Sequence, residues 1–268
     1  MYELKIEVTD TLTPSLCSKL VIKIIQHILY NTRQIPVNYD FLQQYIKGGK
    51  WCLNPNSEYG LLPSNSYRNM LLEQFVNRIL INYNSFEETF KNLEQEFIES
   101  NNLKEIVIMI GATIIMPKKI FRIEIPVLQD CKCNKRNSLQ NNLLCVFKDL
   151  FNSEKFYNYL SENLFPMNVY LLFKTTDSVP PKSGGFLLKE NFRIPNIKQL
   201  HIKMKQPDNS SCVCPSVISL TETSSENSFQ NVEDSESCWY QPKFNLKGFK
   251  DQKVEGRSAF GFIMCQKF

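Results

Sequence analysis

The segment IVIMIGATIIMPKKIFRIEI, residues 106–125, predicts the centre of a β-sheet. Its first five residues are all apolar and mostly β-branched, a pattern that is typical of a strand buried on both faces. Apolar and polar residues then alternate from 119 to 127, and Pro117 lies between the two runs. We therefore expect two neighbouring strands that are joined by a hairpin-like turn.

Further strands are expected on both sides of this pair. Residues 2–8 alternate between apolar and charged side chains, as a half-buried strand does. WYQPKFNLKGF, residues 239–249, indicates a strand that ends at Gly248. Outside the central pair, strands are expected at residues 2–8, 169–173, 199–204, 239–248 and 259–265.

Helical periodicity accounts for much of the remaining chain. Long helices are expected at residues 15–32, 66–99 and 138–162, with a short one at 39–46. Thr13 and Pro14 form the start signal of the first helix, a capping residue followed by proline at the first helical position. Strands and helices do not alternate regularly. The order therefore favours an α+β fold, with helices on one face of a mostly antiparallel sheet.

Composition is typical of a globular protein: the chain has 268 residues, of which 43% are hydrophobic. No apolar run approaches the roughly 20 residues of a membrane-spanning helix, and the N-terminus does not have the pattern of a signal peptide. A net charge of +4 is too small to indicate nucleic-acid binding by itself. We expect the nine cysteines to be reduced thiols of the cytosol or nucleus.

One segment differs from the rest of the chain in charge and composition. Residues 207–237 contain six acidic residues and no lysine or arginine, and they are rich in serine. We interpret them as a disordered acidic insertion. The organisation is then a single domain over residues 1–250 that carries this insertion. The tail, residues 251–268, either adds a strand or stays loose.

Residues that could support catalysis are few. The chain has only two histidines: His27 lies on the apolar face of the first helix, and His201 on the polar face of its strand, where an exposed bystander is expected. Neither predicts a nucleophile–base pair. The chain contains no glycine-rich phosphate-binding motif. Four carboxylates of the long helix are assigned to its solvent face: Glu87, Glu88, Glu94 and Glu96. The protein is therefore predicted not to be an enzyme.

Two cysteine pairs are the best metal candidates, Cys131 with Cys133 and Cys212 with Cys214. Each pair encloses one residue, whereas structural zinc sites usually enclose two to four. The second pair also lies in the acidic insertion. Scattered reduced thiols are the preferred interpretation, so no metal and no cofactor is expected. A zinc-dependent nucleic-acid binder stays as an alternative.

The third long helix is unusual because it has two apolar stripes. One stripe, which is enough to attach the helix to the sheet, contains Leu139, Leu143, Val146, Leu150 and Tyr157. The second contains Leu144, Phe147 and Phe151, with Lys148 beside them. Either this helix is more buried than most, or the second stripe is an exposed patch for a protein partner.

Four segments, in this order, carry a resemblance to a known family: CSKLVIKIIQHILYNTRQIPVNYDFLQQY (17–45), the central pair of strands (106–125), ENFRIPNIKQLHIKM (190–204) and WYQPKFNLKGF (239–249). Together they resemble the comet family of Mad-two-binding proteins of the spindle assembly checkpoint. The resemblance implies a HORMA-like fold of three helices on a sheet. It also implies a C-terminal "safety belt" segment that folds back onto its own domain, with aromatic residues Trp239, Tyr240, Phe244 and Phe249.

The resemblance also implies a function. Members of the family bind the closed conformer of Mad-two through the third helix and the exit of the first. They present it to an AAA+ ATPase that converts it to the open form, which silences the checkpoint. By position, Phe147 corresponds to the central aromatic contact, and Asn31 to a polar contact where we expect glutamine. Lys189 lies near the ATPase-facing segment, where Leu188 replaces the expected proline.

The family leads us to expect two partners, closed Mad-two and an AAA+ ATPase, and no membrane, nucleic-acid or small-molecule partner. The expected location is the nucleus and cytoplasm, with spindle or kinetochores in mitosis. A different HORMA-type adaptor, of meiosis or autophagy, would share the fold without using Phe147.

Overall fold

The computed structural model describes residues 2–47, 66–100, 102–128, 138–176, 181–206 and 238–264. Eight strands of these residues form one sheet, and seven of them follow the order β1–β6–β3–β2–β4–β7–β5. The eighth, β8, pairs with β4 along the same edge as β7, at the other end of β4. The strands are β1 (Tyr2–Glu7), β2 (Leu103–Gly111), β3 (Pro117–Glu124), β4 (Asn168–Thr175), β5 (Phe186–Leu188), β6 (Gln199–Lys205), β7 (Trp239–Pro242) and β8 (Leu246–Lys247). Only β6 pairs in parallel, with β1 and β3. The predicted α+β fold with a mostly antiparallel sheet is confirmed.

The predicted central pair forms as expected. β2 and β3 are antiparallel, with Ile108 opposite Phe121, and every residue of β2 from Glu105 to Gly111 is buried. Gly111 ends β2 because a Cβ atom there would lie only 2.7 Å from the Cα of Pro117. The turn between the strands therefore has space only for glycine at this position.

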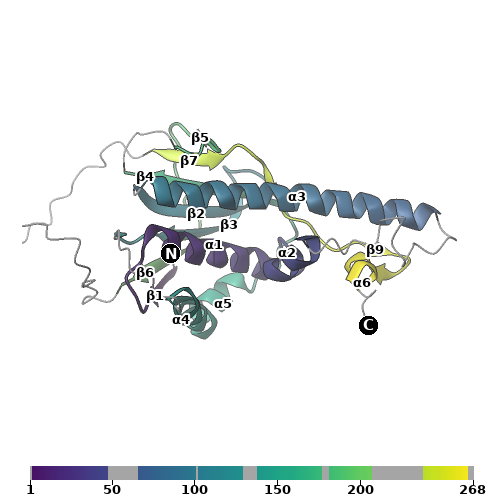
Figure 1. Cartoon of the computed structure of the whole chain (residues 1–268), viewed down its shortest axis with the longest axis horizontal. Coiled ribbons are helices and arrows are strands. Elements are labelled where there is room, and N and C mark those ends of the chain that lie inside the picture. Colours follow the sequence, from purple (N-terminus) through teal and green to yellow (C-terminus); the bar gives the residue numbers. More distant parts are fainter. Residues whose placement is uncertain are drawn as a thin grey trace, which may run out of the picture.

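Helices cover one face of the sheet. The described helices are α1 (Pro14–Asn31), α2 (Tyr39–Lys47), α3 (Ser66–Glu99), α4 (Ser138–Asn152), α5 (Glu154–Leu160) and α6 (Ala259–Met264), of which α6 lies beyond the sheet. The hydroxyl of Thr13 accepts a hydrogen bond from the amide of Leu16, which is the predicted cap of α1. Figure 1 shows α1 and α3 running side by side along the sheet, with α4 and α5 beyond α1. The core lies between these helices and the sheet.

A smaller apolar cluster lies on the opposite face of the sheet. Val107, Met109, Ile120 and Leu172 are fully buried there. The segment between β5 and β6 covers them with Phe192 and Ile194, and Trp239 of β7 joins the cover with its ring 5.4 Å from that of Phe192. This second cluster explains why β2 is apolar on both faces.

The third long helix and the last predicted strand differ in the structure. The third long helix is interrupted at Ser153, whose hydroxyl accepts a hydrogen bond from the amide of Phe156 and starts α5. This break turns Tyr157 away from the buried stripe, and its side chain is exposed. The strand predicted at residues 259–265 is wrong, because residues 259–264 form α6. A two-residue hairpin, β9 (Lys253–Val254) with β10 (Arg257–Ser258), precedes that helix.

The tail between residues 252 and 264 packs on the N-terminal half of α3, which continues past the sheet in Figure 1. The rings of Phe260 and Phe75 lie 5.3 Å apart at 87°, and both side chains are buried. Apolar contact with α3 therefore favours a helix here over a strand.

The assignment of the α3 carboxylates to solvent is wrong for Glu96, which is 2% exposed. Its oxygens accept hydrogen bonds from the hydroxyl of Ser100 and the amides of Lys182 and Ser183, so this carboxylate holds the segment that leads into β5. Glu87 accepts bonds from Tyr39 and is only partly exposed. Helical spacing places a residue on a face but does not reveal a loop that later covers it.

The expectation for His201 is also wrong. Its side chain is buried, with Nε2 3.2 Å from Oε2 of Glu124, because β6 lies between β1 and β3 and long side chains of both neighbours cover it. Burial, with Arg122 nearby, lowers the pKa of His201. Across the described ranges no helix is long and apolar enough to span a membrane. The acidic insertion and both cysteine pairs lie outside the described residues.

Candidate functional site

Two faces of α4 have different environments. Val146 and Leu150 are fully buried against the core, and Leu139 and Leu143 pack partly against it. On the other side, Leu144 is 71% exposed and Phe151 is 51% exposed. The helix is therefore attached by one stripe and presents part of the second to solvent.

Phe147 lies at the border between these faces. Its side chain is partly buried, and its ring is 5.1 Å from the imidazole of His27 on α1 and 6.1 Å from the ring of Phe151. Lys148 is exposed beside it. The second stripe is therefore divided. Phe147 contacts the core, as expected for a more buried helix, whereas Leu144 and Phe151 face solvent, as expected for an exposed patch.

Asn31 joins this region from the last turn of α1. Its amide nitrogen donates a hydrogen bond to the backbone oxygen of His27 at 2.8 Å and lies 3.0 Å from Nε2 of His27. We call the residues Asn31, Leu144, Phe147, Lys148 and Phe151 the α1–α4 surface. An apolar centre with an amide and a lysine at its margin suits a protein partner, since interfaces combine buried aromatic residues with a polar rim.

The sequence alone did not identify two residues that support this surface. His27 was placed on an apolar face, but its contact with α4 could not be deduced from one helix. Phe156 of α5 stacks on His27, with ring centroids 6.0 Å apart and an interplanar angle of 11°. The signal was present at Ser153-Glu154, a helix cap followed by an acidic residue in the first turn.

The C-terminal segment, residues 238–251, pairs with β4 in two short pieces instead of one strand. Tyr240 opposes Phe173 in β7, and Leu246 opposes Val169 in β8. Tyr240 and Phe249 are buried, Trp239 is partly buried, and Phe244 is exposed between the two pieces. The aromatic residues predicted here therefore serve mostly as packing residues of the sheet.

Gln34, directly after α1, fixes the end of this segment. It is fully buried, its backbone oxygen accepts from the amide of Phe249 at 2.8 Å, and its side-chain oxygen accepts from the amide of Met167 at 2.7 Å. A Cβ atom on Gly248 would lie 2.5 Å from that side-chain oxygen. The exit of α1 thus touches both the α1–α4 surface and the C-terminal segment.

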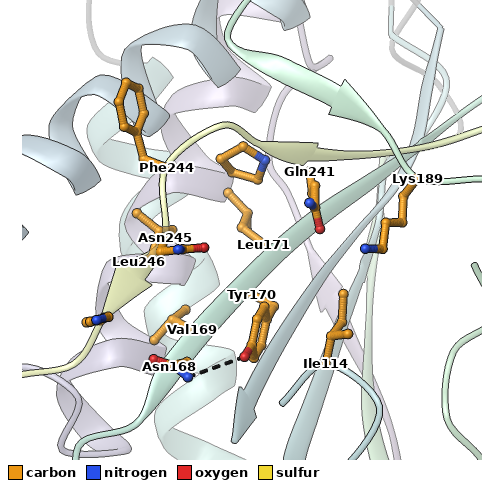
Figure 2. Close-up of a pocket in the computed structure, with 12 residues that line it drawn as sticks. Ile114, Asn168, Val169, Tyr170, Leu171, Lys189, Gln241, Phe244, Asn245 and Leu246 are labelled. Carbon is orange, nitrogen blue, oxygen red and sulfur yellow. Dashed lines mark hydrogen bonds between the residues drawn. The ribbon is translucent and has the colours of Figure 1, made fainter. Parts of the chain in front are cut away.

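Lys189 lies beside a pocket of about 370 Å³ between β4 and the C-terminal segment. Figure 2 shows its ammonium directed into this pocket, toward Gln241 and Tyr170, with Ile114 on the same side of the pocket and Phe244 on the opposite side. The amide of Lys189 donates to the carbonyl of Trp239 at 2.7 Å. The structure does not bring Lys189 together with the α1–α4 surface, since the two lie on different elements and on different sides of the sheet.

Comparison with known proteins assigns the family. Residues 9–251 match the family model of p31comet, whose description is Mad1 and Cdc20-bound Mad2 binding. A search of curated proteins finds no match. The matched range includes the α1–α4 surface, Lys189 and the C-terminal segment, and it stops where the tail begins. The chain belongs to the p31comet family, a family of binding adaptors whose target is Mad2 in its complexes with Mad1 and Cdc20.

Proposed function

We propose that this protein is a non-catalytic adaptor that binds the closed conformer of Mad2 through the α1–α4 surface. The observation that carries the proposal is the exposure of Leu144 and Phe151 on a helix that is already attached by its other stripe. The solvent-exposed parts of these side chains contribute little to folding, so a partner that covers them gives them a role.

Binding of one conformer is the physical basis of the proposed function. An adaptor that binds both conformers equally well changes nothing, whereas differential affinity selects and stabilises one of them. The α1–α4 surface is suited to such selection because both helices are fixed by buried side chains. Val146 and Leu150 hold α4, and a mostly apolar buried face holds α1.

We further propose that the C-terminal segment acts as a safety belt that occupies its own domain in a HORMA-like fold. The hydrogen bond that the amide of Phe249 donates to the backbone oxygen of Gln34 supports this role, because it attaches the end of the segment to the exit of α1. A segment held in this way leaves the domain without an open sheet edge at β4 for a ligand peptide.

Presentation of Mad2 to an AAA+ ATPase, with conversion to the open form and silencing of the checkpoint, completes the proposal. Lys189 is the residue we assign to the ATPase. In support, its ammonium is directed into a pocket remote from the α1–α4 surface, so one molecule could contact Mad2 and the ATPase together. This activity places the protein in the nucleus and cytoplasm, and at the spindle or kinetochores in mitosis.

Binding to conformer-locked Mad2 tests the first part. Leu144→Glu places a charge in the surface and should lower affinity for the closed form by at least about tenfold, an effect above 1 kcal/mol. Its matched control is Ile81→Glu on α3, which is 67% exposed and lies outside the surface. Thermal melting of each variant identifies loss of fold. Equal binding of both conformers by the wild type, or equal effects of the two substitutions, would refute the proposal.

The ATPase part is tested separately with Lys189→Ala. This variant should bind closed Mad2 like the wild type and slow its ATPase-driven conversion to the open form. Lys243→Ala, an exposed lysine of the C-terminal segment, is the charge-matched control. An unchanged conversion rate for Lys189→Ala would remove Lys189 from the proposal and leave Mad2 binding untouched.

A further inference from the structure

The imidazole of His27 is the central contact beneath the α1–α4 surface. It meets the ring of Phe147 at 5.1 Å and 70°, and the ring of Phe151 at 5.2 Å and 90°. On its third side it stacks on Phe156, a buried residue of α5. Edge-to-face contacts of this kind favour one orientation of the rings. His27 therefore connects two partner-facing aromatic residues to the core.

The hydrogen bonds of Asn31 determine the protonation state of this imidazole. A backbone carbonyl can only accept, so the Asn31 atom 2.8 Å from the oxygen of His27 must be the amide nitrogen. The same amide nitrogen, which can only donate, also lies 3.0 Å from Nε2 of His27. Nε2 must then be the acceptor. The imidazole is neutral, with its proton on Nδ1.

We infer that His27 is a positioning residue of the α1–α4 surface, an inference that rests on the proposed function. Its neutral ring orients Phe147 and Phe151 and fixes the amide of Asn31. Both hydrogens of that amide are then in use, and its oxygen has no hydrogen bond within the described ranges. A partner that contacts this oxygen is expected to offer it a donor, an N–H or O–H group.

Protonation of His27 disrupts this arrangement. An Nε2–H would face the N–H of Asn31, so the amide must turn and lose its bond to the carbonyl of His27. Burial lowers the pKa of His27 below its ordinary value, and no charged group contributes to that shift. The rings against the imidazole are uncharged, and the charged residues nearest in sequence on the same elements are Lys23, Lys148, Asp149, Glu154 and Lys155.

The test is the affinity of the full chain for closed-locked Mad2, measured from about pH 7.5 to about pH 5.5, the range in which histidine titrates. The wild type should lose affinity toward acid pH, by at most about tenfold per pH unit for one proton. His27→Phe keeps a ring between the aromatic residues but cannot be protonated, so its profile should be flatter. Protons that Mad2 itself binds affect both proteins equally and cancel in the comparison.

Two further measurements separate positioning from stability. His27→Ala should weaken binding by about tenfold at neutral pH, in the range of an interface residue, at temperatures where its melting curve shows a folded protein. Ile81→Ala on α3 is the control and should bind like the wild type. Nitrogen NMR of the imidazole should show the neutral form with the proton on Nδ1.

Several results would overturn the inference. If His27→Phe has the same pH profile as the wild type, His27 is not the group that titrates. If His27→Ala binds with the affinity of the wild type, His27 does not position the surface. If Leu144→Glu abolishes binding while both His27 variants retain it, the proposed function stands and this inference alone fails. If the wild type does not bind closed Mad2 at any pH, both fail together.

Discussion

The α1–α4 surface and the C-terminal segment were both predicted to contain functional aromatic residues, and they use them differently. In the C-terminal segment, Tyr240 and Phe249 point into the core and the backbone pairs with β4. In the α1–α4 surface, Phe151 is half exposed and Phe147 only partly covered. An aromatic residue on a segment that the sheet holds contributes to folding, whereas one on the second stripe of a helix is free to bind.

This difference has a consequence for mutagenesis. Changes in the C-terminal segment should lower the free energy of unfolding and leave the affinity of the folded protein for Mad2 intact. Changes in the α1–α4 surface should lower the affinity for Mad2 and leave the free energy of unfolding nearly intact. Phe147 is partly buried and also belongs to the α1–α4 surface, so its substitution tests whether one residue can contribute to both stability and binding.

The largest effect is expected from Phe249→Ala. Phe249 is buried, and removing its ring should lower the free energy of unfolding by about 3–5 kcal/mol, the usual range for a buried phenylalanine. Denaturant unfolding measures this loss. A normal unfolding midpoint for this variant would mean that the C-terminal segment is not part of the cooperative fold.

Phe147→Ala should affect both quantities. We expect a loss of about 2 kcal/mol in binding to closed Mad2, as for a central interface residue. The free energy of unfolding should also fall, but by less than for Phe249→Ala, because Phe147 is only partly buried. Calorimetric titration and a denaturant series on the same sample give both values. A stability loss as large as that of Phe249→Ala, with no change in binding, would assign Phe147 to the core.

Gly248→Ala should lower stability by about 1 kcal/mol or more, since its methyl group would overlap the side-chain oxygen of Gln34 at 2.5 Å. Gly261→Ala, within α6, is a control for loss of glycine, because an added methyl group there meets nothing closer than 3.4 Å. If that change lowers stability as much as Gly248→Ala does, the contact with Gln34 is not what requires glycine at 248.

The smallest effect is expected from pH. Burial lowers the pKa of His27 in the folded state, so below about pH 6.5 the unfolded chain binds more protons than the folded one. The contribution of His27 to stability is therefore complete above that pH and is lost as the pH falls. Urea unfolding should show less loss on acidification for His27→Phe than for the wild type. His201 acts in the same direction and remains in both proteins as a constant background.

Much of the fold followed from local sequence patterns. The apolar run at 106–110, the Thr13-Pro14 start of α1 and the periodicity of 66–99 each depend on residues close in the chain, and each predicted its element correctly. The α4–α5 break was missed because a long apolar periodicity hid the cap at Ser153. The helix at 259–264 was missed because its partner, the overhanging end of α3, is distant in sequence.

The candidate site was predictable only in part. The second stripe of α4 could be identified from helical spacing, and the family resemblance directed attention to Phe147. What one helix cannot reveal is which residue of another element lies behind it. His27 and Phe156 come from α1 and α5, and only the packed structure brings them against Phe147 and Phe151. The same limit made Glu96 look exposed, since residues 182–183 cover it from far along the chain.

The central claim is that the half-exposed aromatic residues of α4 bind one conformer of Mad2. Its most direct test is the affinity of the wild type and of Phe151→Ala for closed-locked and open-locked Mad2, with a melting curve for each protein. We predict that the wild type prefers the closed form, and that Phe151→Ala loses at least about tenfold in that affinity with an unchanged melting curve. Equal affinity of the wild type for both conformers, or unchanged binding by Phe151→Ala, would contradict the account.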